Sequence, residues 1–211
     1  MDRTELQSAT TLTSRQGRVY VVSGPSGVGK DMVLAEMLAG PFRLDGIHRV
    51  VTATTRPARS FERDGIDYHF LSEDEFAARE RSGWFLETAP FGPARYGTPR
   101  GPVETLPAQG LDVILKIDTK GAMQVKALAP GCVLVFIWPP SVEELETRLR
   151  SRSTEKAGEI AERMRTARQE LATVHRYDFV IVNRHVSVAA DALRAIIVAD
   201  RHRLDGGATC P

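Results

Sequence analysis

A glycine-rich stretch between an apolar run and a helix-forming segment constrains the fold of this chain most strongly. Residues 21–30 read Val-Val-Ser-Gly-Pro-Ser-Gly-Val-Gly-Lys and contain the pattern G-x-x-x-x-G-K. Glycines let backbone N–H groups converge on phosphate oxygens, and the helix N-terminus adds partial positive charge. A turn that only links a strand to a helix does not need this full spacing. We therefore predict an ATP-binding loop formed by Gly24, Pro25, Ser26, Gly27, Val28, Gly29, Lys30 and Asp31.

Position 31 departs from this pattern, because Asp31 stands where Ser or Thr normally offers a hydroxyl to Mg²⁺. One interpretation is an acidic residue that only interacts with the helix dipole, worth about 0.3–1 kcal/mol. The other is a carboxylate that meets Mg²⁺ directly or through water. The second interpretation makes Asp31 a candidate metal ligand and predicts that nucleotide binding depends more steeply on Mg²⁺ than with a serine at this position.

Short apolar runs alternate with helical segments along the chain. Runs rich in β-branched residues predict buried parallel strands at 19–22, 113–117, 133–137 and 179–182, with a weaker fifth at 49–53. Helices are expected at 30–39, 119–127, 141–150, 159–175 and 188–203. Capping-box patterns start helices after Ser72 and Ser141, Gly83 is placed to end the first of these, and Pro139 follows a strand. This alternation predicts an α/β fold, a doubly wound parallel five-stranded sheet.

Composition excludes several other classes of protein. The formal net charge of +1 provides no global field toward a nucleic acid polymer or a membrane. The two cysteines, Cys132 and Cys210, do not form a disulfide framework or a metal site. The polar first residues lack the apolar core of a secretory signal, and no segment is apolar enough to span a bilayer. We expect a cytoplasmic protein, a monomer or a homo-oligomer.

Residues 52–100 carry arginines and aromatic residues without a long buried strand, which is typical of an inserted substrate-binding subdomain. Arg56 and Arg59 can form forked hydrogen bonds to a phosphate, and Tyr68 and Tyr96 can donate O–H bonds to it. Glu87 accepts hydrogen bonds only, when ionised, and therefore matches the N1–H and 2-amino donors of guanine, which adenine lacks in that arrangement.

At these residues the chain resembles the guanylate kinase family. The family pattern T-T-R-x-x-R, G-x-x-Y, F-x-E and Y-G-T/S is present in order at 54–59, 65–68, 85–87 and 96–98, and the resemblance extends from about 18 to 203. It implies a P-loop kinase that transfers the γ-phosphoryl of ATP to GMP, and to dGMP, in purine nucleotide metabolism. It also implies a core at 17–51, 101–147 and 169–205, a GMP-binding subdomain at 52–100 and a helical lid at 148–168, between a flexible leader at 1–16 and a tail at 206–211.

The resemblance also implies roles for further residues. Thr52 and Thr98 would complete the contacts with the base, and Asp118 would hold guanine or the water shell of the metal. The implied GMP-binding set is Thr52, Arg56, Arg59, Tyr68, Glu87, Tyr96, Thr98 and Asp118. Phosphoryl transfer needs positioning and charge stabilisation rather than a protein nucleophile. The implied catalytic set is therefore Lys30, Arg56 and the lid arginines Arg148, Arg152 and Arg163.

The chain differs from the family at two positions near Asp118. Lys116 stands where an acid is usual, and Lys120 replaces a common glutamine, so the acceptor and metal contacts near them stay open. Two alternative functions also remain. Ribose 1,5-bisphosphate kinases resemble the chain at Gly29-Lys30-Asp31, although a site with Tyr68, Glu87 and Tyr96 suits a nucleotide. Non-catalytic guanylate kinase-like interaction modules lose the phosphate-loop and lid residues that this chain keeps.

Overall fold

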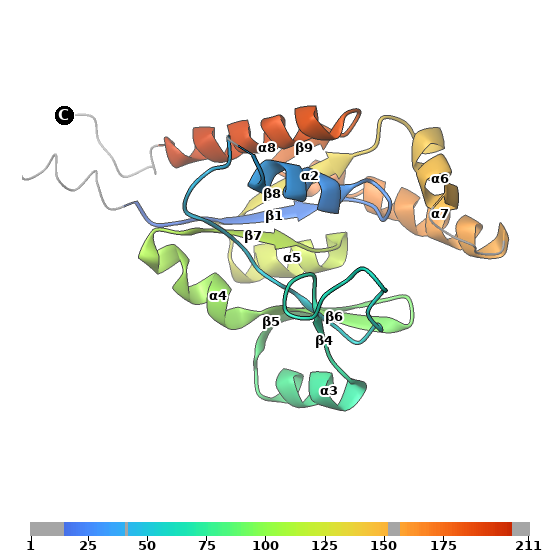
Figure 1. Cartoon of the computed structure of the whole chain (residues 1–211), viewed down its shortest axis with the longest axis horizontal. Coiled ribbons are helices and arrows are strands. Elements are labelled where there is room, and N and C mark those ends of the chain that lie inside the picture. The colour runs from blue at the N-terminus through green and yellow to red at the C-terminus, as the bar shows by residue number, and fades with distance from the viewer. Residues whose placement is uncertain (1–14, 41, 152–156, 204–211) are drawn as a thin grey trace, which may run out of the picture. The chain divides into compact units, whose positions relative to one another are not determined.

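The computed structural model describes residues 15–40, 42–151 and 157–203 (Figure 1). It contains a five-stranded sheet with strand order β2-β7-β1-β8-β9 and a four-stranded sheet with order β4-β3-β6-β5. The chain divides into two compact units, one made of the residues up to Ser23 with Gly46–Leu134, the other of Gly24–Asp45 with the residues from Val135 onward. The α/β class and the five-stranded parallel sheet are confirmed.

The first unit contains three parallel strands of the five-stranded sheet. β1 (Val19–Ser23) and β2 (Ile47–Arg49) both pair with β7 (Asp112–Lys116). The apolar residues of β1 and β7 are fully buried between Tyr20 and Val22 and between Val113 and Leu115. Helix α5 (Thr119–Leu128) follows β7, and α4 (Arg100–Thr105) with the 3-10 turn Pro107–Gln109 precedes it. The predicted strands at 19–22 and 113–117 are confirmed to within one residue.

The four-stranded sheet also belongs to the first unit and lies within the predicted subdomain at 52–100. Its strands are β3 (Ala53–Thr54), β4 (His69–Phe70), β5 (Phe85–Phe91) and β6 (Ala94–Pro99), and β5 pairs antiparallel with β6. Helix α3 (Glu73–Arg81) packs its one buried residue, Phe76, on Phe85 with ring centroids 4.5 Å apart. The prediction of no long buried strand is confirmed, since β5 buries only alternate residues, but this half-buried strand was not predicted.

The predicted strand at 49–53 was also wrong. Residues 50–52 lie between β2, which ends at Arg49, and β3, which begins at Ala53 in the other sheet. The apolar pair Val50-Val51 therefore belongs to the chain segment that passes from one sheet to the other. An apolar run shows that these residues avoid water, but it does not show which strand they would pair with.

The second unit contains β8 (Val133–Trp138) from Val135 onward, where it pairs parallel with β9 (Phe179–Val182). It also contains the helices α2 (Lys30–Leu38), α6 (Val142–Ser151), α7 (Ala157–Leu171) and α8 (Val186–Arg201). The predicted helices correspond to these four, but α7 ends earlier, and a 3-10 turn at Val174–Arg176 follows it. Helix α2 packs on α8 (Figure 1). Strand β9 is not buried as predicted, because it forms the edge of the sheet: Phe179, Val180 and Val182 are exposed.

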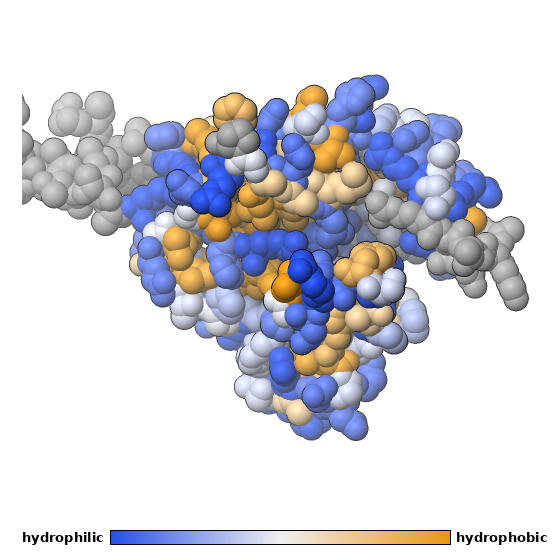
Figure 2. Space-filling view, viewed as in Figure 1, coloured by the Kyte–Doolittle hydropathy of each residue, from blue (hydrophilic) through white to orange (hydrophobic). Residues whose placement is uncertain are grey.

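Local signals in the sequence determine where α3 begins and ends. Ser72 and Glu75 form the predicted capping box, and backbone bonds from Gly83 to Glu80 and from Trp84 to Arg79 close the helix. At the start of α6 the backbone N–H of Glu144 donates to Ser141 Oγ at 3.1 Å. Figure 2 shows mostly hydrophilic residues over α3 and α6, as expected for helices that bury one side only.

Two contacts hold the N-terminal end of the described chain. Arg15 forms an ion pair with the fully buried carboxylate of Asp112, and Gly17 N–H donates to the Pro107 carbonyl at 2.8 Å. The chain is therefore anchored from Arg15 onward, whereas most of the predicted leader and the predicted tail lie outside the described residues.

Every helix in the described ranges is too short or too polar to cross a membrane. Cys132 is a buried free thiol.

Candidate active site

The glycine-rich loop joins β1 to α2, as the sequence predicts. Gly24, Gly27 and Gly29 have φ values of 137°, 84° and 96°, and Gly29 is the N-cap of α2. A Cβ atom at Gly24 would lie 2.4 Å from the Ile137 carbonyl oxygen, and one at Gly29 would lie 2.7 Å from Asn183 Nδ2. Larger residues would therefore clash with backbone or with a buried amide at both positions. This loop has the geometry that lets backbone N–H groups surround a phosphate.

Asn183 supports the glycine-rich loop through a side-chain hydrogen bond. It was not among the predicted site residues. It follows β9, is buried, and donates from Nδ2 to the Val28 carbonyl at 2.8 Å. Arg148 adds two longer contacts, from NH1 to the Val28 carbonyl at 3.5 Å and from NH2 to the Asn183 carbonyl at 3.4 Å. The segment after β9 therefore holds the loop in shape. The sequence showed an asparagine after an apolar strand but not its distant partner.

Lys30 and Asp31 occupy the first turn of α2. Lys30 Nζ donates to the carbonyls of Gly24 at 2.6 Å and Pro25 at 3.0 Å, so its ammonium lies over the loop. Phosphate oxygens are charged acceptors and form stronger bonds with an ammonium than neutral carbonyls do. Asp31 is exposed in the same turn. One carboxylate beside a phosphate site is a donor set that suits Mg²⁺, which takes its other ligands from phosphates and water.

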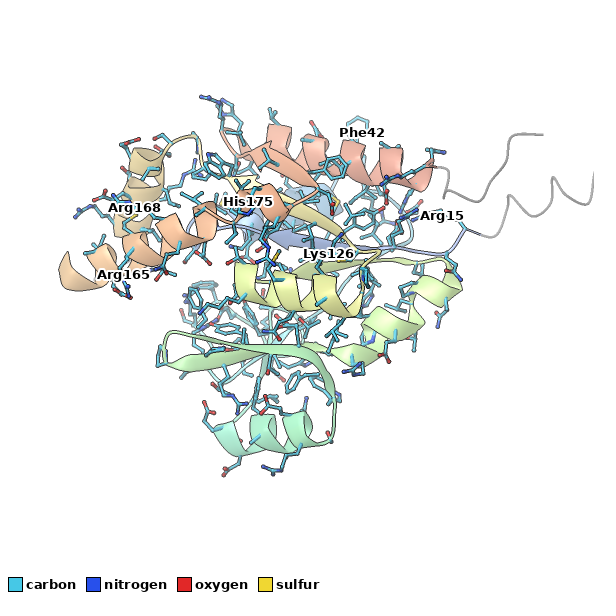
Figure 3. The ribbon with its side chains drawn as sticks, turned by 180° about the vertical axis from the view of Figure 1, so that it is seen from behind. Arg15, Phe42, Lys126, Arg165, Arg168 and His175 are labelled. Atoms are coloured by element: carbon cyan, nitrogen blue, oxygen red, sulfur yellow. The ribbon has the colours of Figure 1, made fainter. Side chains whose placement is uncertain are left out.

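The predicted lid arginines are described only in part. Arg148 on α6 donates from Nε to Glu144 at 3.0 Å, and Arg163 on α7 donates from NH2 to Ser26 Oγ in the loop at 3.4 Å. Both therefore lie at the glycine-rich loop. Arg152 lies outside the described residues. The other basic residues of this segment that the structure describes are exposed, as expected for a solvated helix face: Arg150, Arg165 and Arg168, of which the last two are labelled on α7 in Figure 3.

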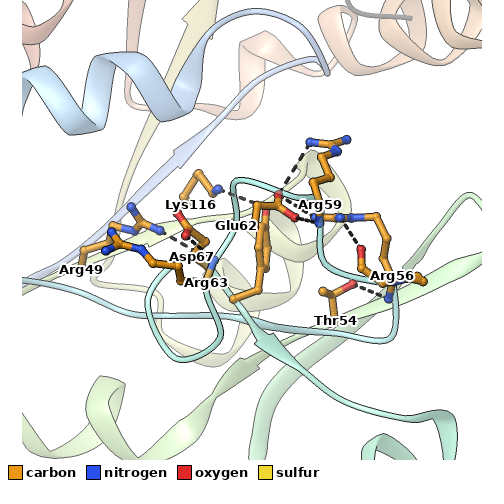
Figure 4. A network of polar contacts seen from close by, with 10 residues as sticks. Arg49, Thr54, Arg56, Arg59, Glu62, Arg63, Asp67 and Lys116 are labelled. Atoms are coloured by element: carbon orange, nitrogen blue, oxygen red, sulfur yellow. Dashed lines mark hydrogen bonds and ion pairs between the residues drawn. The ribbon is translucent and has the colours of Figure 1, made fainter. Parts of the chain in front are cut away.

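In the first unit the predicted phosphate-binding residues form one cluster, of which Figure 4 shows Arg56 and Arg59 beside Glu62. Arg56 NH2 donates to Glu62 Oε1 at 2.9 Å, and the Arg59 backbone N–H donates to Glu62 Oε2 at 2.9 Å. The Arg56 guanidinium carbon lies 5.6 Å from the centre of the Tyr68 ring, which meets the Tyr96 ring edge-on at 6.0 Å. Arg56 therefore connects Glu62 with the two tyrosines, and Arg59 joins this group through its backbone.

Glu62 and Arg56 affect each other's protonation. Burial would raise the pKa of Glu62, but hydrogen bonds from Arg56 and from the Arg59 backbone outweigh it and hold the pKa below its ordinary value. Burial would lower the pKa of Arg56, but contacts with Glu62 and Tyr96 hold it above its ordinary value. Both groups are therefore charged at neutral pH. Sequence analysis did not select Glu62, since a single glutamate in a charged loop carries no distinctive signal.

A second group of predicted residues gathers on β5, β6 and the start of α5. Thr98 Oγ1 donates to Glu87 Oε1 at 2.6 Å, and both side chains are buried. Asp118 is the N-cap of α5 and accepts from the Gly121 N–H at 2.7 Å. A Cβ atom at Gly121 would lie 2.9 Å from Glu87 Oε2, so only glycine leaves room for this carboxylate. Thr52 is buried just before β3.

Burial raises the pKa of Glu87 to about 7, and the nearby charge of Asp118 adds to this, while the hydrogen bond from Thr98 opposes it. The carboxylate therefore changes charge near neutral pH. Such a group in a polar pocket is suited to recognising a ligand that offers N–H donors, because donors favour its ionised form.

Comparison with known proteins places these residues in a family. A family model described as guanylate kinase matches residues 16–200. A guanylate kinase of Streptococcus agalactiae serotype III is 42% identical over 193 residues, which is 91% of each chain. One from Symbiobacterium thermophilum is 44% identical over 188 residues, covering 89% of this chain and 88% of that protein. The crystal structure of guanylate kinase from Anaplasma phagocytophilum matches with a TM-score of 0.74 and 30% identity, covering 90% of this chain and 89% of that one.

Proposed function

Since this chain belongs to the guanylate kinase family and is a nucleotide kinase, we propose that it transfers the γ-phosphoryl group of ATP to GMP, and to dGMP. The observation that carries the proposal is the buried carboxylate of Glu87, held by Thr98 in the same unit as the cluster of Arg56, Tyr68 and Tyr96. Glu87 with Thr98 suits guanine, and the cluster of Arg56, Tyr68 and Tyr96 suits a phosphate. A nucleoside monophosphate carries both.

Glu87 selects the base. Ionised, its carboxylate has room for several hydrogen bonds, of which Thr98 supplies one. The N1–H and 2-amino groups of guanine supply two more. Adenine would leave a buried acceptor without a donor, at a cost of about 1–3 kcal/mol or more. Thr52 and Asp118 complete this side of the acceptor site.

Arg56, Arg59, Tyr68 and Tyr96 bind the phosphate of the acceptor. The Arg56 guanidinium is already held by Glu62, so it loses little conformational freedom when a phosphate arrives. Arg59 is held through its backbone N–H, and its exposed guanidinium lies 3.7 Å from the same carboxylate. Two arginines and two hydroxyl donors match the oxygens of a monophosphate. The bound oxygen then attacks the γ-phosphorus of ATP, and the bond between the γ-phosphorus and the β-phosphate oxygen breaks to release ADP.

The second unit binds ATP and stabilises the charge that develops during transfer. The loop from Gly24 to Gly29 surrounds the phosphates with N–H donors, and Lys30 moves from the loop carbonyls to phosphate oxygens. Arg148, Arg152 and Arg163 contribute positive charge to the transferred group. Because these groups act by position and charge, the reaction needs no protein nucleophile.

Mg²⁺ bound with ATP neutralises phosphate charge, and Asp31 is the residue that would meet it. Without the metal, a carboxylate ~4 Å from a phosphate charge costs about 4 kcal/mol at an effective dielectric near 20. ATP affinity should therefore rise more steeply with Mg²⁺ concentration in this protein than in Asp31→Ser. Calorimetric ATP titrations at several Mg²⁺ concentrations measure this difference, and identical curves for the two proteins would refute a role of Asp31 toward the metal.

A substrate panel tests the proposed reaction. Purified protein with ATP and Mg²⁺ is supplied with GMP, dGMP, AMP, UMP or ribose 1,5-bisphosphate, and ADP formation is measured for each. We expect turnover with GMP and dGMP, and at least 100-fold lower kcat/KM with AMP and UMP. Turnover of ribose 1,5-bisphosphate without GMP would replace the proposal with the alternative small-molecule kinase.

Two variants connect the reaction to the residues. Lys30→Ala should reduce kcat by about 100-fold or more, because the transferred phosphoryl loses a cation in its transition state. Glu87→Ala should raise the KM for GMP and leave the KM for ATP unchanged. If the protein bound no ATP in calorimetry, it would be a non-catalytic interaction module rather than an enzyme.

A further inference from the structure

Lys116 lies beside the residues that bind the acceptor phosphate, although nothing in the proposed reaction uses it. It is the last residue of β7 and its side chain is buried, with 9% of the residue exposed. Nζ donates to Tyr68 Oη at 3.1 Å and lies 4.7 Å from the centre of the Tyr68 ring. Figure 4 shows Lys116 in one view with Arg56, Arg59 and Glu62.

This hydrogen bond determines the role of the Tyr68 hydroxyl. A phenol has one hydrogen to donate and lone pairs that accept, whereas an ammonium can only donate. The ammonium of Lys116 therefore occupies a lone pair of Tyr68 Oη, and the hydroxyl hydrogen must point to another acceptor. A carboxylate at position 116 would have the opposite effect, since it would take the Tyr68 hydrogen for itself.

The position of Lys116 also adds a charge where an anion is expected. Two cations lie near the Tyr68 ring, with Lys116 Nζ at 4.7 Å and the Arg56 guanidinium carbon at 5.6 Å from its centre. Both contacts favour a fixed ring, because cations are attracted to aromatic rings within about 6 Å. Lys116 thus fixes Tyr68 in place and increases the positive potential around its hydroxyl.

We propose that Lys116 is a positioning residue for the acceptor: it holds the Tyr68 hydroxyl as a donor to the acceptor phosphate and makes this half of the site selective for a phosphorylated, dianionic acceptor. The proposal rests on the proposed function, because it assigns Tyr68 to the acceptor phosphate. Lys116 acts on the phosphate of the acceptor and not on its base or on ATP.

Comparing two ligands that differ only in the phosphate tests this role. GMP and guanosine are titrated by calorimetry, or guanosine by competition against GMP, into the parent, Lys116→Met and Lys116→Arg. We expect Lys116→Met to weaken GMP binding about 10-fold, to change guanosine binding less than 2-fold, and to raise the KM for GMP without a change in the KM for ATP. Lys116→Arg, which keeps the positive charge and the hydrogen-bond donor, should retain most of the GMP affinity of the parent.

Two controls make the result specific. Arg81→Met removes a positive charge from an exposed position on α3 in the same unit and should leave GMP affinity unchanged. In a Tyr68→Phe background, Lys116→Met should weaken GMP binding less than 3-fold, since only the charge of Lys116, and no longer its hold on the hydroxyl, then acts on the phosphate. A full 10-fold loss in that background would overturn the assignment to Tyr68.

Each remaining outcome also decides the question. Equal losses for GMP and guanosine would make Lys116 a structural residue and overturn the proposal, as would unchanged GMP affinity in Lys116→Met. Thermal unfolding of each variant identifies a folding defect. If the parent itself neither bound nor phosphorylated GMP, the proposed function would fail, and this result differs from a parent that is active while Lys116→Met is unaffected.

Discussion

At the scale of single residues, Glu87 links recognition of the base to pH. Its pKa is raised to about 7, and in the proposed function guanine binds only the ionised form. Guanosine affinity should therefore be constant above pH 8 and fall towards tenfold per pH unit below pH 6. Guanosine is the better probe here, because the phosphate of GMP also titrates near pH 6. Calorimetry between pH 5.5 and 8.5 measures the profile, and Glu87→Gln should have a flat one. A flat profile in the parent would contradict the assignment.

The same carboxylate should lower stability as the pH rises. The pKa of Glu87 is higher in the folded state than the ordinary 4.5, so the folded protein keeps a proton that the unfolded chain has released. The free energy of unfolding therefore decreases from pH 4.5 to pH 7 by up to roughly 3 kcal/mol from this group, and the decrease ends above pH 7. Urea unfolding of the parent and Glu87→Gln at pH 5 and pH 8 tests this. The variant should lose less stability between the two, and equal losses would contradict the raised pKa.

Sequence reasoning at this scale found residues that belong to short motifs and missed those defined by distant contacts. Arg56, Glu87 and Thr98 stand in motifs of three to six residues, where spacing alone points to a role. The bond from Asn183 to Val28 spans 155 positions, and the bond from Lys116 to Tyr68 spans 48. Nothing local in the sequence indicates such partners, because only the fold brings them together.

At the scale of elements, the sequence predicted the buried strands well and the second sheet poorly. β1 and β7 are continuous apolar runs, which a parallel strand covered on both faces requires. β5 instead alternates, with Phe85, Glu87 and Ala89 on its buried face. Glu87 occupies a buried position where an alternating strand usually has an apolar residue, so the apolar-polar alternation that identifies a strand is interrupted. Glu87, the residue proposed to select the base, is thus also the residue that made β5 difficult to predict.

The contact between the end of β9 and the glycine-rich loop gives a prediction at the same scale. Asn183→Ala removes the bond to the Val28 carbonyl and the amide packed behind Gly29. We expect a loss of about 1–3 kcal/mol in stability and an increase of about tenfold in the KM for ATP, with the KM for GMP unchanged. Steady-state kinetics and thermal unfolding measure both effects. Val182→Ala, at the exposed neighbouring position, is the matched control, and an Asn183→Ala variant that behaved like it would show that the loop holds its shape without this support.

At the scale of the whole molecule, the residues proposed for each of the two substrates lie in separate units. The glycine-rich loop, Asn183, Arg148 and Arg163 belong to the unit made of 24–45 and the residues from 135 onward, whereas Arg56, Tyr68, Glu87 and Asp118 belong to 46–134. Amide hydrogen exchange slows where a ligand stabilises local structure. Saturating GMP should therefore protect peptides from 46–134, with the largest effect at 52–68 and 85–98, while ADP should protect 24–38 and the segment around 183. Glu87→Ala should abolish the protection by GMP and leave the protection by ADP unchanged. Protection by GMP that was strongest in the loop of the parent would refute this division of the binding sites between the units.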